Sequence, residues 1–168
     1  MTNQLSLMVS GIAVGISVLS LCFAWYSWRQ ANRPFVTARV TTNTSGNQAT
    51  ALDICVENTG NRPARNVILK TNNDDVLKCL ADDMHGEIPN DIKQCFYKNL
   101  SIPVLANGKA VRNAFGMFSK DGKSTWKAGS VLPIIISFQD IGRRRFKQKV
   151  NLVFADDTGF AQTFWQKG

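Results

Sequence analysis

Histidine is almost absent from this chain of 168 residues, since His85 is the only one. This scarcity excludes metal sites built from several histidines and leaves one histidine as a possible catalytic base. A zinc site would have to combine His85 with Cys79, Cys95 and the distant Cys55, a spacing unlike closely paired zinc ligands. No phosphate-binding loop, G-x-S-x-G elbow or H-E-x-x-H helix occurs. We therefore expect no metal, no cofactor and no enzymatic activity; a cysteine–histidine pair brought together only by folding is the alternative.

Charged side chains are missing from residues 5–28, a run of 24 positions. As a helix, this run is ~36 Å long and can cross the ~30 Å hydrocarbon core of a bilayer. No basic group precedes it and no Ala-x-Ala pattern follows it, so we do not expect cleavage as a secretory signal. The sequence thus predicts a short tail at 1–4, a transmembrane helix at 5–28, a juxtamembrane linker at 29–33 and one domain at 34–168.

Basic residues flank the predicted span on its C-terminal side only, at Arg29, Arg33 and Arg39. Lys and Arg near a span stay mainly on the cytoplasmic side, which predicts a single-pass protein of the inner (cytoplasmic) membrane with a cytoplasmic C-terminal domain. Aromatic rings with a polar group prefer the headgroup region of the bilayer. The expected interface anchors are Trp25, Tyr26, Trp28, Arg29 and Arg33.

Cysteine usage leaves a second topology open. Cys55, Cys79 and Cys95 form an odd set after the span, so at least one thiol stays unpaired. In a reducing compartment all three are buried thiols. The alternative is a periplasmic or extracellular domain with a Cys79–Cys95 disulfide.

Small residues recur within the predicted span, where Gly11 and Gly15 lie four positions apart. This spacing places both glycines on one helix face and lets a second helix approach closely. It favours a homodimer or docking on another membrane protein. The alternative is that small residues are simply common in membrane helices.

Residues 34–168 alternate apolar and polar side chains over short segments, which is the pattern of half-buried strands. The expected strands are 36–40, 52–56, 67–70, 102–105, 111–118, 131–138, 146–154 and 160–165. Apolar residues at helical spacing predict short helices or irregular loops at 74–83 and 91–98, with Asn90 as the cap of the second. Without long helices between the strands, the expected fold class is mainly β, an antiparallel sandwich with short insertions.

Three segments carry a resemblance to a known family. Residues 56–67, VENTGNRPARNV, resemble the V-x-N-x-G-x-x-x-A-x-x-V segment of bacterial Ig-like, CARDB-type sandwiches. Residues 105–109 are similar to their L-x-P-G turn, with Asn107 in place of proline, and residues 138–142 resemble their aromatic-x-D-x-G hairpin. The resemblance implies an Ig-like β-sandwich and supplies no catalytic residue. It extends to single-span bacterial membrane proteins of unknown function, whereas named CARDB-type members are often adhesive and extracellular.

A basic run near the C-terminus gives the candidate contact surface. The candidate basic contact face consists of Arg143, Arg145, Lys147 and Lys149. On a strand, alternate residues project to one side, while Phe146 points to the other. Such a face fits anionic lipid, an acidic partner or nucleic acid; the alternative is a solvated strand that discourages edge pairing. Nucleic acid is not expected, because no RNP-like aromatic pair, helix-turn-helix or zinc-finger spacing accompanies the charge.

Together these features predict a membrane-anchored, non-enzymatic accessory or protein-interaction subunit with a cytoplasmic β-sandwich. The expected partners are the lipid bilayer and a protein, or a second copy bound through the transmembrane helix. One alternative is a membrane-acting effector or sensor whose sandwich recognises a ligand and whose helix oligomerises. The other is an exported adhesive domain. The sequence identifies no small-molecule ligand.

Overall fold

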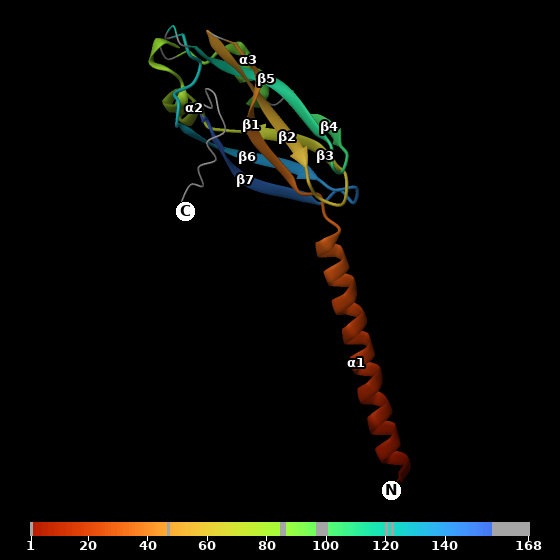
Figure 1. The fold of residues 1–168 in the computed structure, drawn as a ribbon. Coiled ribbons are helices and arrows are strands. Elements are labelled where there is room, and N and C mark those ends of the chain that lie inside the picture. The colour runs from red at the N-terminus through yellow and green to blue at the C-terminus, as the bar shows by residue number, and fades with distance from the viewer. Residues whose placement is uncertain are drawn as a thin grey trace. The chain divides into compact units, whose positions relative to one another are not determined.

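The computed structural model describes residues 2–46, 48–84, 87–96, 101–119, 121 and 123–155 (Figure 1). The chain divides into two compact units, Met1–Arg33 and Pro34–Gly168. The first is one long apolar helix and the second holds two antiparallel sheets with short helices. The fold class predicted from the sequence is therefore confirmed. The predicted strand at 160–165 lies outside the described residues, as does the end of the predicted helix at 91–98.

The first unit is helix α1, Thr2–Ala31, which spans the predicted tail and most of the predicted linker as well as the apolar run. Its end is capped by Asn32, whose backbone N–H and side-chain amide both donate to the Trp28 carbonyl at 3.0 Å. Within α1, Leu7–Ala31 is long and apolar enough to cross a membrane, with a mean hydropathy of 2.3 and no side chain buried. A helix of this kind is typical of a membrane anchor or a signal sequence.

The second unit contains seven described strands in two sheets (Figure 1). The three-stranded sheet has the order β1 (Val36–Ser45), β2 (Ala49–Asn58), β5 (Ala110–Ser119). The four-stranded sheet has the order β4 (Ile102–Leu105), β3 (Ala64–Lys70), β6 (Val131–Gln139), β7 (Arg145–Val153). In an Ig constant-type domain the fourth strand lies beside the fifth. Here β4 pairs with β3 instead, so no strand of the described residues pairs with the second edge of β5.

Short helices connect β3 to β4: α2 (Asn73–Cys79), a 3₁₀ turn (Asp82–Met84) and α3 (Asn90–Phe96). The segment predicted to hold short helices or irregular loops, 74–83, contains most of α2 and the start of the 3₁₀ turn, and Leu80 between them is extended and forms a bridge with Trp126. The prediction that Asn90 caps the second helix is wrong. The first bond of α3 runs from the Lys93 N–H to the Pro89 carbonyl at 3.0 Å, so Pro89 holds the cap position.

The core fills the space between the sheets with the inward side chains of both. Its aromatic centre is Phe115, Trp126 and Phe154, with ring centroids 4.8 Å apart for Phe115–Trp126 and 4.2 Å for Trp126–Phe154. The Trp126 indole N–H donates to the Phe115 carbonyl. Next to Phe115, Gly116 adopts φ +106, and a Cβ there would lie 2.8 Å from the Thr125 side chain. Only glycine fits this position.

Asn58 joins the two sheets at one end of the sandwich. It is fully buried; its side-chain amide donates to the carbonyls of Arg62 (2.7 Å) and Leu105 (3.1 Å). Its side-chain oxygen accepts from the N–H groups of Phe35 (3.2 Å) and Gly60 (3.1 Å). The bonds to Phe35 and Leu105 place the start of β1 beside the end of β4. We call this end of the sandwich the Phe35 end.

Candidate functional site

Five exposed cations share the outer face of the four-stranded sheet. The strand register aligns Lys70 with Ile135 and Lys149, and Arg65 with Gln139 and Arg145, with Lys147 between these rows. The basic face is therefore Arg65, Lys70, Arg145, Lys147 and Lys149. None of the strands β3, β4, β6 and β7 contains an acidic residue, and none of the ion pairs in the described part of the chain uses these cations. The face is positive and uncompensated.

Arg143 does not lie on this strand, contrary to the sequence-based prediction. β7 begins at Arg145, and Arg143 occupies the β6–β7 turn with φ +61, where its N–H donates to the Asp140 carbonyl at 3.1 Å. The Arg144 N–H donates to the Asp140 side chain at 2.9 Å and so closes the turn. Alternation along the sequence assumes an unbroken strand, and the turn breaks it.

Arg65 and Lys70 join the basic face from β3, and the sequence analysis did not single them out. They lie about 80 residues before β7 in the chain and share a face with it only because β6 pairs with both strands. Exposed aliphatic side chains lie on the same outer face. Ile135 is 39% exposed, Val131 46% and Val153 39%. A surface that mixes cations with aliphatic groups suits a protein interface.

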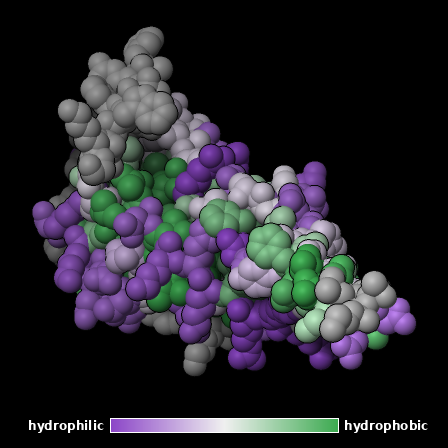
Figure 2. Space-filling view, turned by 90° about the horizontal axis from the view of Figure 1, so that it is seen from below, coloured by the Kyte–Doolittle hydropathy of each residue, from purple (hydrophilic) through white to green (hydrophobic). Residues whose placement is uncertain are grey.

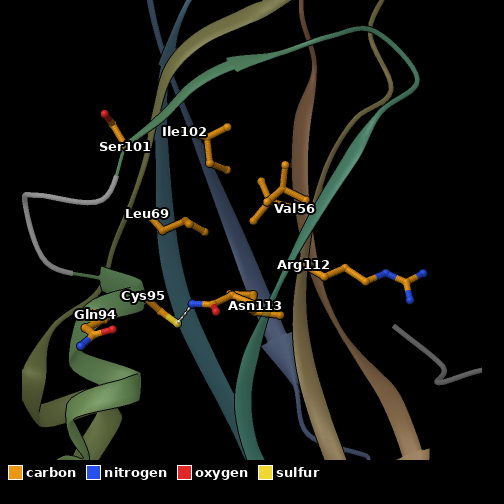
Figure 3. A pocket seen from close by; sticks show the side chains of 10 residues that line it. Val56, Leu69, Gln94, Cys95, Ser101, Ile102, Arg112 and Asn113 are labelled. Carbon is orange, nitrogen blue, oxygen red and sulfur yellow. Dashed lines mark hydrogen bonds between the residues drawn. The ribbon is translucent and has the colours of Figure 1, made fainter.

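A cleft opens between the sheets beside the edge of β5 that pairs with no described strand (Figure 3). Its volume is about 270 Å³, and its aliphatic floor includes Ile54, Val56 and Leu69. Its α3 side carries Cys95, whose Sγ accepts from the Asn113 side-chain amide at 3.2 Å. In Figure 3 Arg112 extends away from the cleft, which leaves mainly neutral groups inside. The cleft exists because β4 pairs with β3 and not with β5.

The thiols show no sign of activation. Burial raises the pKa of the Cys95 and Cys79 thiols above their ordinary value of 9.0, which keeps both protonated near neutral pH. All four cysteines are free, so no disulfide joins Cys79 to Cys95. Among the described residues no three His, Cys, Asp or Glu side chains lie together as a metal site would require. His85 lies outside the described part of the chain.

The predicted packing and anchoring residues lie on α1, except Arg33, which follows the end of the helix. Gly11 and Gly15 face open space, with no atom within 4 Å of an added Cβ. Near the C-terminal end of the helix the Arg29 guanidinium lies over the Trp25 ring, 3.9 Å from its centroid, and Tyr26 accepts from the Gln30 amide at 2.9 Å. Trp28 is exposed, while Arg33 donates to Gln30 at 3.5 Å. A guanidinium stacked on an indole suits the bilayer interface, but the roles of these residues stay predictions.

A comparison with known protein families finds a match over most of the chain. Residues 6–156 match a family model described as "Domain of unknown function (DUF8453)". The match covers most of the chain, including α1 from residue 6 onward and all seven described strands, so the chain belongs to this family. No curated protein and no solved structure matches it.

Proposed function

We propose that this protein is a single-pass, membrane-anchored interaction subunit without enzymatic activity, whose basic face binds a protein with an acidic surface. The observation that carries the proposal is the single-sign charge of that face, where five cations lie on strands that contain no carboxylate. Opposite charge on a partner speeds encounter and fixes its orientation. The exposed aliphatic side chains beside the cations supply apolar area to bury.

Anchoring makes a modest surface sufficient for binding. A helix that stays in the bilayer confines the sandwich to the membrane surface, which raises its effective concentration toward other membrane-bound proteins. We place the sandwich on the cytoplasmic side of a bacterial inner membrane, because Arg29, Arg33 and Arg39 all follow the span. We also propose that the sandwich is Ig-like and related to CARDB-type domains. In support, the asparagine of the V-x-N-x-G segment is the buried Asn58.

Charge reversal tests this proposal. The full chain with Lys147→Glu and Lys149→Glu should recover about tenfold less of the acidic partner after cross-linking in cells and purification in detergent. A matched control, Arg112→Glu with Lys123→Glu, makes the same change in net charge away from the basic face and should recover the partner normally. Equal recovery by both double variants would show that the basic face is not the contact surface. If no protein co-purifies reproducibly, the proposal fails.

The cleft favours a second candidate function, a ligand sensor whose helix oligomerises. The cleft reaches Ile54 and Val56 in the core and is large enough for a small ligand. Ligand binding there would be coupled to helix association through Gly11 and Gly15. The associated helices would disturb the bilayer, so overexpression of the intact chain should depolarise cells. The double variant Gly11→Leu with Gly15→Leu should abolish this depolarisation. Normal membrane potential with both chains would remove this candidate.

A further inference from the structure

Two large apolar side chains are exposed at the Phe35 end of the sandwich. Phe35 is 42% exposed and Ile141 is 51% exposed. Arg65 pairs with Gln139, the last residue of β6, and with Val104 of β4. The β6–β7 turn therefore lies at the same end of the sandwich as Leu105, the last residue of β4. The Asn58 side chain bonds to both the Leu105 carbonyl and the Phe35 N–H. These loops gather at one end of the two sheets (Figure 1).

The β6–β7 turn holds Ile141 at its tip. The Asp140 N–H donates to the Arg144 carbonyl at 3.0 Å, and the Asp140 carbonyl accepts from the Arg143 N–H at 3.1 Å. Arg143 adopts φ +61, a conformation that favours glycine or asparagine over arginine. Strained backbone of this kind concentrates at functional positions. The turn alone would be formed more easily by glycine or asparagine, so Arg143 is a candidate for a role of its side chain.

Cations outnumber anions around this turn. Arg143 and Arg144 are both exposed, and so is Lys109 in the β4–β5 turn, whose carbonyl accepts from the Asn58 N–H at 3.1 Å. Of the nearby carboxylates, Asp140 accepts a bond within the turn and Glu57 pairs with Arg39 at 3.2 Å. An aliphatic tip surrounded by cations is the chemistry of a peripheral membrane contact. The aliphatic group enters the boundary between headgroups and acyl chains, and the cations meet lipid phosphates. In the view of Figure 2, seen from below, hydrophilic side chains surround smaller hydrophobic areas.

The connection to α1 is short. Only residues 32–35 separate the last helical residue from the first residue of β1. An extended chain covers at most about 3.6 Å per residue, so the start of β1 can lie no more than about 18 Å from the end of the helix. If the helix is in a bilayer, the Phe35 end is therefore the part of the sandwich that the chain holds within reach of the lipid surface.

We propose that Ile141, Arg143 and Arg144 form a second membrane contact that binds an anionic phospholipid surface. The proposal rests on the proposed function in one respect, the anchoring of α1 in a bilayer. The contact holds the Phe35 end of the sandwich at the lipid surface. It uses the turn at the end of the sheet and leaves the basic face free for a partner.

Hydrogen exchange of the full chain in nanodiscs tests the contact. Backbone amides of residues 140–144 should exchange about fivefold more slowly in phosphatidylcholine mixed with phosphatidylglycerol than in phosphatidylcholine alone. Amides of residues 73–79, in α2 at the opposite end, should be unchanged. Equal exchange of the turn in both lipids would overturn the proposal.

Matched variants separate the contact from the fold. Ile141→Ser with Arg143→Gly keeps a turn-compatible backbone and should lose the lipid-dependent slowing. Leu77→Ser, which removes an exposed aliphatic group (38% exposed) from α2, should keep it. Slowing that survives in the first variant would show that these side chains do not make the contact. Release of the wild-type chain from membranes by alkaline carbonate would instead disprove the anchor, and with it the proposed function.

Discussion

The outer faces of the two sheets differ, although the inner faces of both contribute to one hydrophobic core. On the three-stranded sheet two outward residues of the middle strand are buried, with Cys55 1% exposed and Asp53 7% exposed. A charge pair, Arg39 with Glu57 at 3.2 Å, lies on the same face. On the four-stranded sheet Ile135 is 39% exposed and the charges are all positive. The centre of the first face is therefore closely packed, whereas the centre of the second face is exposed.

The largest expected effect comes from placing a charge on each face. Cys55→Lys puts an ammonium group at a buried position between Arg39 and Arg112 and should lower the free energy of unfolding by about 4 kcal/mol. Ile135→Lys, at an exposed position on the other sheet, should change it by no more than about 0.5 kcal/mol. Urea denaturation followed by tryptophan fluorescence measures both. Similar losses in the two variants would mean that the faces do not differ as described.

The next effect concerns the link between the sheets. Asn58→Ala removes four side-chain hydrogen bonds, those to the Phe35 and Gly60 N–H groups and to the Arg62 and Leu105 carbonyls. The expected loss in the free energy of unfolding is about 3 kcal/mol. Asn113→Ala serves as the control. Asn113 is exposed and donates one hydrogen bond to the buried Cys95 thiol. Its replacement should lower the free energy of unfolding by less than about 1 kcal/mol. If both variants lose the same free energy of unfolding, the Asn58 side chain does not join the two sheets in the way described.

The sequence was sufficient to predict the strands of both sheets but not the difference between their outer faces. Alternation correctly assigned Leu52, Ile54 and Val56 to the core. Alternation placed Cys55 on the opposite side of β2 from these three residues. Its burial there, expected only from cysteine usage, depends on β1 and β5 lying beside β2. Pairing of distant strands is a tertiary property, which no local pattern reports.

The candidate sites show the same limit. Three of the four cations predicted for the contact face, Arg145, Lys147 and Lys149, are exposed on one side of β7. The sequence analysis did not include Arg65 in the contact face, because the residues around it are typical of a turn followed by a strand. Trp126 was missed as a core residue because the segment around it has no periodicity; its burial comes from stacking on Phe154. The cleft depends on which sheet β4 joins.

A third prediction uses pH. The pKa of Cys95 is raised in the folded state, so the folded chain holds its proton at pH values where the unfolded chain has lost it. The stabilisation is complete below pH 9.0 and is lost as the pH rises through the folded-state pKa, by up to about 1.4 kcal/mol per pH unit. Cys95→Ala should reduce this part of the alkaline decline in urea titrations. An identical decline in the variant would assign it to other groups.

The smallest effect tests the ion pair on the three-stranded sheet. Glu57→Gln should lower the free energy of unfolding by about 0.5 kcal/mol, because the Arg39 side chain is largely exposed and water screens the pair. The difference should shrink in high salt. Arg145→Gln, on the face without a carboxylate, should not destabilise the fold, since no partner is lost. A clear destabilisation by Arg145→Gln would reveal compensation on the basic face.

Gly116 has an evolutionary consequence. Its positive φ and the 2.8 Å approach to Thr125 leave no room for any side chain, whereas Gly108, at φ +67, has open space around its missing Cβ. Once family members are aligned over this region, position 116 should therefore be invariant, while position 108 should drift to asparagine in some lineages. The close contact between β5 and residue 125 should therefore be visible in such an alignment as an invariant glycine at position 116.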